Sequence, residues 1–132
     1  MRMNGETGGP ADEVGEPTAE VIRFDAVEHG DGAVVLHVSG EVDTLTAPML
    51  SERIADTLPS ATLLVLDLSS VTFLGSAGLA ALVAAKDDAQ QQGRRLTLVC
   101  GSRIVTRALE ATGLLGLFDT ADGVPEALRP TA

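Results

Sequence analysis

Apolar and polar positions alternate along two neighbouring stretches of the chain. Residues 21–28, VIRFDAVE, fit one strand, and residues 33–40, AVVLHVSG, fit a second. The turn sequence HGDG between them predicts a β-hairpin. In the second stretch one face carries Val34, Leu36 and Val38, and the other carries Val35, His37 and Ser39. We interpret His37 as an ordinary side chain on a half-exposed strand face.

Apolar residues recur at helical spacing in three later segments, each with recognisable end signals. The first has Pro48 in its first turn. The second starts at Ser76 and ends before Gly93, a suitable C-terminal cap. The third is capped by Ser102 and stops at Gly113. These signals predict three helices.

Short apolar runs between the helices predict buried strands. Residues 62–68, TLLVLDL, are apolar on both faces, and residues 96–100, LTLVC, form a similar run. Residues 115–120, LGLFDT, fit a short last strand, and residues 124–128, VPEAL, a final helical turn. The order is β-β-α-β-α-β-α-β-α. It predicts a small α/β domain with a mixed or parallel sheet and right-handed crossovers.

The first twenty residues have a different composition from the rest of the chain. Residues 1–20 hold four Gly, two Pro and five acidic residues against one Arg, and almost no large apolar residue. Such a segment buries too little surface to offset the entropy lost on ordering. We therefore expect a disordered acidic tail over residues 1–20 and one domain over residues 21–129.

The charge of the chain bears on its partners. The formal net charge is −10, which disfavours a protein built to grip a phosphate backbone. We expect protein partners and no nucleic acid. The densest basic stretch is Arg94, Arg95, Arg103 and Arg107. It is interpreted as solvated helix and turn surface, the alternative being a nucleic-acid patch.

Cysteine content and the chain ends suggest a location. The one cysteine, Cys100, cannot form an internal disulfide, and no Cys/His cluster with zinc spacing accompanies it. We interpret Cys100 as a small buried residue and expect no metal and no cofactor. No apolar segment resembles a signal peptide, and turn residues interrupt the uncharged run 68–85. A cytoplasmic protein without direct membrane contact is expected.

The stretch FLGSAGLAAL places Ser76 between two glycines, where an apolar run gives way to a helix. A nucleophile elbow requires G-x-S-x-G, but Leu74 stands at the first glycine position. Both histidines, His29 and His37, precede the serine, contrary to the order of that fold. A phosphate-binding loop needs a lysine next to its second glycine, whereas the nearest lysine, Lys86, lies ten residues beyond Ser76. The chain is therefore not expected to be an enzyme.

Two interpretations of Ser76 remain open at this point. The hydroxyl can act as an N-cap that accepts a hydrogen bond from the N–H of Gly78 or Leu79, worth about 1 kcal/mol. It can also be a phosphoacceptor, because the positive end of a helix tolerates a phosphate dianion. Both roles are compatible. A small ligand or nucleotide at the same helix end is a third alternative, with no lysine or glycine-rich loop to support it.

Two motifs resemble a known family. DLSSVTFLGSAGL, residues 67–79, and VSGEVDTLTAP, residues 38–48, resemble the STAS domain of bacterial anti-sigma factor antagonists. The resemblance covers most of residues 21–128. It implies a STAS fold and a protein that binds an anti-sigma factor with a serine-kinase domain, which frees a sigma factor. A serine phosphatase is a further implied partner, and we expect a monomer.

The resemblance also implies roles for individual residues. Ser76 corresponds to the family's phosphoacceptor, whose phosphorylation ends the interaction. The partner-binding residues that it implies are Gly40, Glu41, Asp43, Gly75, Ala77, Gly78 and Leu79.

Gly75 and Ala77 depart from the family pattern. They stand where the family usually has Asp and Ser or Thr. Gly75 either alters recognition by the kinase or permits closer approach of a partner backbone. The alternative function from another class is a STAS module that is never phosphorylated and serves as scaffold or subunit of a membrane transport complex. Capture of the partner separates the two functions.

Overall fold

The structure is a computed structural model that describes residues 22–129. The acidic tail predicted over residues 1–20 lies outside this range. Five strands form one sheet in the order β1-β2-β3-β4-β5. β1 is antiparallel to β2, and the remaining neighbours are parallel. The α/β fold and the element order are therefore confirmed. The strands are β1 (Ile22–His29), β2 (Ala33–Val42), β3 (Leu63–Leu74), β4 (Arg95–Val99) and β5 (Asp119–Ala121).

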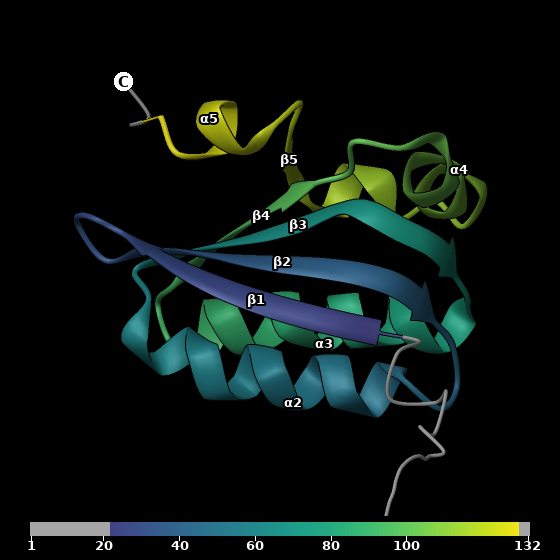
Figure 1. Cartoon of the computed structure of the whole chain (residues 1–132), viewed down its shortest axis with the longest axis horizontal. Coiled ribbons are helices and arrows are strands. Elements are labelled where there is room, and N and C mark those ends of the chain that lie inside the picture. Colours follow the sequence, from purple (N-terminus) through teal and green to yellow (C-terminus); the bar gives the residue numbers. More distant parts are fainter. Residues whose placement is uncertain (1–21, 130–132) are drawn as a thin grey trace, which may run out of the picture.

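Four α-helices connect and cover the strands (Figure 1). They are α2 (Ala47–Thr57), α3 (Ser76–Gln91), α4 (Arg103–Ala111) and the short α5 (Val124–Ala127). α2 and α3 lie side by side and cover one face of the sheet, and α5 lies on the opposite side. Two 3₁₀ turns, Leu58–Ser60 and Leu115–Leu117, complete the described part.

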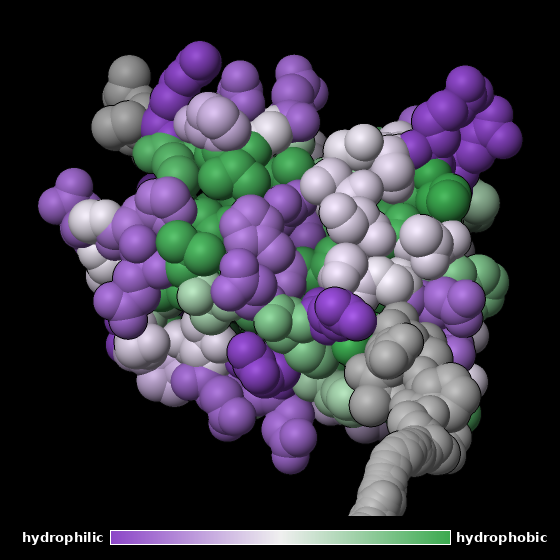
Figure 2. Space-filling view, viewed as in Figure 1, coloured by the Kyte–Doolittle hydropathy of each residue, from purple (hydrophilic) through white to green (hydrophobic). Residues whose placement is uncertain are grey.

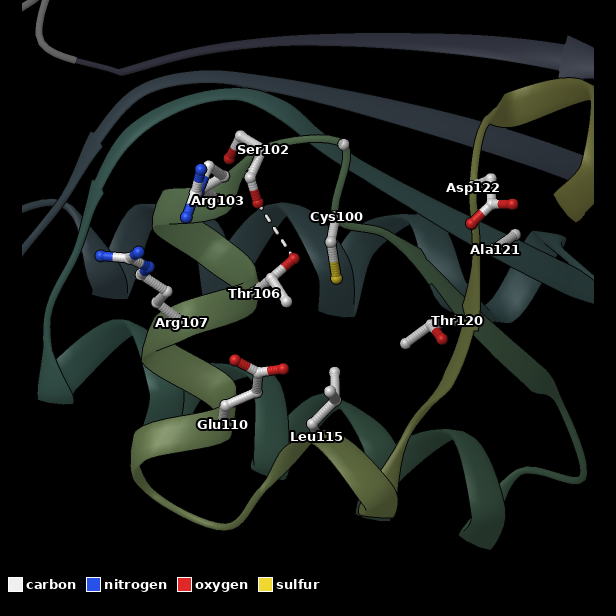
Figure 3. A pocket seen from close by; sticks show the side chains of 11 residues that line it. Cys100, Ser102, Arg103, Thr106, Arg107, Glu110, Leu115, Thr120, Ala121 and Asp122 are labelled. Carbon is white, nitrogen blue, oxygen red and sulfur yellow. Dashed lines mark hydrogen bonds between the residues drawn. The ribbon is translucent and has the colours of Figure 1, made fainter.

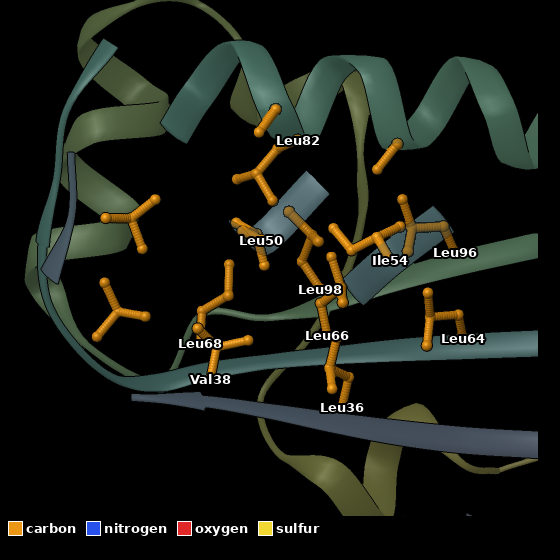
Figure 4. Packing of buried hydrophobic residues seen from close by; sticks show 14 of the residues in the cluster. Leu36, Val38, Leu50, Ile54, Leu64, Leu66, Leu68, Leu82, Leu96 and Leu98 are labelled. Carbon is orange, nitrogen blue, oxygen red and sulfur yellow. The ribbon is translucent and has the colours of Figure 1, made fainter. Parts of the chain in front are cut away.

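The main core lies between the sheet and the pair α2 and α3. Alternate residues of β2, β3 and β4 point to this side, where they meet Leu50, Ile54 and Leu82 from the helices (Figure 4). A smaller cluster on the other face joins Val35 and Val65 to Ala127 of α5. Because both faces are covered, the central strand has to be apolar on both sides, as the run TLLVLDL predicts.

The predicted end signals of the helices are confirmed. Pro48 lies in the first turn of α2. Gly93 follows α3 with φ +68°, a left-handed conformation that glycine adopts without steric cost. The Ser102 hydroxyl accepts a hydrogen bond of 3.4 Å from the N–H of Val105 at the start of α4. The hairpin is also confirmed, with Asp31 and Gly32 at positive φ in its turn.

Two predicted strands differ from the structure. β3 continues to Leu74, six residues beyond the predicted run, because its second half pairs with β2 although Ser69, Ser70 and Thr72 are exposed. The segment 115–120 is a strand only from Asp119. Its first residues form a 3₁₀ turn, closed by a 3.0 Å bond from the N–H of Leu117 to the carbonyl of Leu114.

The surface shows no broad apolar area on the side seen in Figure 1. Figure 2 shows hydrophobic residues there separated by hydrophilic ones. Within residues 22–129, no helix is long and apolar enough to cross a membrane.

Candidate functional site

The junction of β3 and α3 places Ser76 on the surface. Gly75 is the single residue between them and takes the N-cap position with ordinary extended backbone, φ −91° and ψ −177°. Ser76 is the first residue of the helix and is exposed. Its hydroxyl makes no hydrogen bond to any residue of the described range, and α3 has no side-chain cap. The interpretation of Ser76 as the N-cap is therefore wrong, because the helix begins at Ser76 itself and Gly75 takes the N-cap position.

The first turn of α3 presents unpaired backbone donors. The first backbone bond at the start of α3 runs 3.0 Å from the N–H of Leu79 to the carbonyl of Gly75. The N–H groups of Ser76, Ala77 and Gly78 precede it and have no partner within the helix. Together with the helix dipole they give this end a partial positive charge. A phosphate on the Ser76 hydroxyl would lie at this end.

The turn after β2 lies beside the junction that carries Ser76. Glu41 pairs with Phe73 and Val42 with Leu74, so the end of β2 is directly next to the end of β3. The N–H of Gly75 donates a 3.0 Å bond to the carbonyl of Val42. Gly40 has φ +105° beside an irregularity in the β2–β3 pairing, a conformation that strongly favours glycine. The strand pairing thus brings the two sequence motifs into one site.

Asp43 holds the shape of this turn. Its Oδ1 atom accepts bonds of 3.0 Å from the N–H groups of Leu45 and Thr46. The Thr46 side chain, 2% exposed, accepts a 2.9 Å bond from the N–H of Asp43 and lies 2.8 Å from the carbonyl of Glu41. Hydrogen bonds from Thr46, and then from Leu45, hold the pKa of Asp43 below its usual value. The carboxylate is thus ionised and oriented toward its own backbone.

Gly78 and Leu79 lie in the interior behind Ser76. A Cβ atom on Gly78 would be 2.6 Å from both Val42 Cγ1 and Leu74 Cδ1, so only glycine fits without movement. Leu79 is buried in the main core. The missing side chain of Gly78 lets α3 lie close to β2, and the buried side chain of Leu79 holds the helix against the core. Because both residues are buried, these two of the predicted partner-binding residues offer little surface to a partner.

Gly75 and Ala77 border two apolar features. A Cβ atom on Gly75 would lie 3.0 Å from Cε2 of Phe73, so the exposed phenyl ring rests against this glycine. Ala77 is half-buried and lines a shallow hollow of about 370 Å³ between α2 and α3. The other residues around this hollow are Thr44, Ala47, Pro48, Ser51, Ala80, Ala81 and Ala84.

A polar cluster that the sequence did not reveal lies where β2 pairs with β3. The Nδ1 atom of His37 is 2.7 Å from Oδ2 of Asp67, and the Ser69 hydroxyl donates a 2.6 Å bond to Oδ1. The two partners bind different oxygens of the carboxylate, and within the described residues no hydrogen bond joins His37 to Ser69, so the histidine is not placed as a base for this serine. His37 and Asp67 are directly paired across the strands, which only the register reveals.

Acid should weaken the fold partly through Asp67. Burial opposes its ionisation, but bonds from Ser69 and His37 outweigh this effect and hold the pKa of Asp67 below the usual 3.8. The stabilisation is therefore complete above pH 3.8 and is lost as the pH falls through the lowered folded value. In urea unfolding over an acid pH series, the free energy of unfolding of Asp67→Asn should decrease less than that of the wild type. Equal decreases would contradict this role.

A larger hollow lies elsewhere, between α4 and β5. It measures about 560 Å³ and includes Cys100, Thr106 and Thr120 in its lining (Figure 3). Burial raises the pKa of the Cys100 thiol, which therefore stays neutral and weakly nucleophilic. The side chain of Arg107 extends away from β5 in Figure 3. Nothing in this lining forms a reactive pair.

The basic stretch is mainly surface. Arg95, Arg103 and Arg107 are exposed, whereas Arg94 is half-buried. Among residues 22–129, no three His, Cys, Asp or Glu side chains come together as metal ligands.

Comparison with known proteins identifies the family. The STAS domain family matches residues 25–127. Anti-sigma-F factor antagonist RsfB of Mycobacterium tuberculosis is 35% identical over 99 residues, which cover 74% of this chain and 80% of RsfB. The anti-sigma-B factor antagonist of Bacillus subtilis is 27% identical over 93 residues, 70% of this chain and 85% of that protein.

Comparison with solved structures leads to the same family. The crystal structure of an anti-sigma factor antagonist from Mycobacterium paratuberculosis matches with a TM-score of 0.71 and 33% identity, over 81% of this chain and 91% of that one. This chain belongs to the STAS-domain family of anti-sigma factor antagonists. The family consists of regulators rather than enzymes.

Proposed function

We propose that the chain binds an anti-sigma factor carrying a serine-kinase domain through the surface around Ser76, and thereby frees a sigma factor. Phosphorylation of Ser76 by that kinase ends the interaction, and a serine phosphatase restores it. The chain acts in the cytoplasm as a monomer and contacts neither nucleic acid nor membrane. Membership of the antagonist family supports binding of an anti-sigma factor. The geometry of Ser76 supports the switch.

The observation that carries the proposal is the state of the Ser76 hydroxyl. It is exposed at the first position of α3 and makes no hydrogen bond with any described residue. A hydroxyl used as a helix cap would have to give up that bond on entering a kinase site. The Ser76 hydroxyl has no such bond to lose, so it can enter a kinase site without local unfolding.

The surroundings of Ser76 explain how one phosphate acts as a switch. In the free protein, water and the N–H groups of the first helical turn solvate the dianion. In the complex the same dianion is removed from water, and Glu41, which pairs with Phe73 at the end of β3, adds like charge to this corner. Neither Glu41 nor Asp43 offers a counter-charge. The phosphate therefore destabilises the complex and leaves the free chain intact.

The test is a kinase reaction with the anti-sigma partner and ATP. We expect added phosphate mass on the peptide that contains Ser76. Ser76→Ala should remove this mass, and Ser51→Ala, which changes an exposed serine of α2, should retain it. Absence of phosphate on the wild type in complex with an active kinase, or unchanged phosphorylation of Ser76→Ala, would contradict the switch.

A further inference from the structure

We propose that Leu45 and Phe73, two exposed apolar side chains on the segments that meet at the Ser76 junction, are the anchors of the partner interface and enter an apolar pocket of the anti-sigma factor. This inference rests on the proposed function and specifies the chemistry of its partner. Leu45 is 75% exposed and Phe73 50% exposed. Other large apolar side chains of the described residues are also exposed, but Leu45 and Phe73 lie on the turn after β2 and the end of β3, which meet next to Ser76.

The fold holds Phe73 next to Ser76. Phe73 is the penultimate residue of β3 and pairs with Glu41. Its ring would contact a Cβ atom on Gly75 at 3.0 Å from Cε2 and 3.4 Å from Cζ, so the ring lies over the residue that precedes Ser76. Gly75 therefore leaves space for an aromatic ring beside the hydroxyl. Aromatic residues are enriched among the residues that dominate binding energy at interfaces.

The fold also holds Leu45 in place. The N–H groups of Leu45 and the following Thr46 both donate to Oδ1 of Asp43, and Thr46 is buried. Leu45 thus projects from a turn whose backbone is already fixed before a partner arrives. Thr44, its neighbour, lines the same hollow as Ala77, so the turn lies against the first turn of α3. A fixed anchor loses little conformational entropy on binding. Asp43 is accordingly a positioning residue for Leu45.

The chemistry around these anchors favours a protein pocket over other occupants. Glu41 and Asp43 lie on the same corner, and carboxylates oppose contact with an anionic membrane surface. The proposal also explains the switch more fully. A phosphate on Ser76 within an interface anchored by apolar side chains loses its water and gains no cation from these anchors. The apolar anchors therefore make the interface sensitive to the charge on Ser76.

The experiment measures the dissociation constant for the anti-sigma partner with Leu45→Ala, Phe73→Ala and the double variant. Each single change should weaken binding roughly ten- to hundredfold, with the unfolding midpoint retained. Phe73→Leu, which keeps an apolar side chain, should retain most of the affinity. Leu117→Ala is the matched control, because Leu117 is 51% exposed in the 3₁₀ turn before β5. It should bind within about twofold of wild type.

Other outcomes distinguish this inference from the proposed function. If the wild type binds and both alanine variants bind equally well, the anchors are wrong and the proposed function stands. If the wild type binds no kinase-type anti-sigma factor, the proposed function itself fails. Self-association of the wild type that is lost in both alanine variants would assign these side chains to a second copy of this chain and overturn the proposal.

Discussion

Phosphorylation of Ser76 is expected to weaken binding to the anti-sigma partner by roughly thirty- to over a hundredfold, without unfolding the chain. The phosphate adds a charge of about −1.5 to −2 on a surface that the partner must cover. A loss of about 2 to 3 kcal/mol at the interface is sufficient for this change in affinity. The effect is electrostatic and local, because Ser76 is exposed and the core behind it is unchanged.

The same phosphate should leave the unfolding midpoint of the free protein unchanged or slightly raised. The modified group lies at the positive end of α3, where an anion stabilises a helix by about 0.3–1 kcal/mol. Calorimetric titration and thermal unfolding of both forms provide the two measurements, with Ser76→Ala as an uncharged control that should still bind. A phosphorylated form that loses both affinity and stability would show that the switch acts by unfolding α3.

Replacement of Gly78 by valine should produce the largest loss of stability, about 1–3 kcal/mol or somewhat more. The new side chain has no space, since even a Cβ atom would lie 2.6 Å from Val42 Cγ1 and from Leu74 Cδ1. These two residues end the strands that carry the Glu41 corner and the Ser76 junction. The variant should therefore move α3 away from the corner and lower partner affinity as well.

A matched control separates crowding from helix propensity. Ala84→Val introduces the same β-branched side chain at an exposed position of α3. It should cost only a few tenths of a kcal/mol. Urea unfolding of both variants gives the comparison. Equal losses in the two variants would show that the close contact of Gly78 with β2 contributes nothing to stability.

The sequence predicts most of the fold because its signals are local. The hairpin follows from turn residues between alternating runs, and the helix ends follow from Pro48, Gly93 and Ser102. The errors occur where pairing between distant segments overrides local composition. β3 extends through Ser69 and Ser70 because β2 provides hydrogen bonds along this length. The 3₁₀ turn at Leu115 is an exception with a local cause, because the N–H of Leu117 donates a hydrogen bond to the carbonyl of Leu114.

The candidate site could be predicted only in part. The position of Ser76 at a strand-to-helix junction is confirmed. The sequence did not reveal that Ser76 leaves the capping position to Gly75, because this depends on the residue at which α3 begins. The support of Phe73 by Gly75 and the pairing of His37 with Asp67 depend on three-dimensional contacts between residues that no local pattern connects.

Release of a sigma factor from its anti-sigma factor is the most direct test of the central claim. A labelled sigma factor is first bound to the kinase-type anti-sigma factor, and this chain is then added in unmodified and Ser76-phosphorylated forms. Fluorescence anisotropy reports the free sigma factor. We expect the unmodified chain to release it and the phosphorylated chain to release none at the same concentration. Sigma factor that stays bound at saturating unmodified chain, or equal release by both forms, would contradict the account.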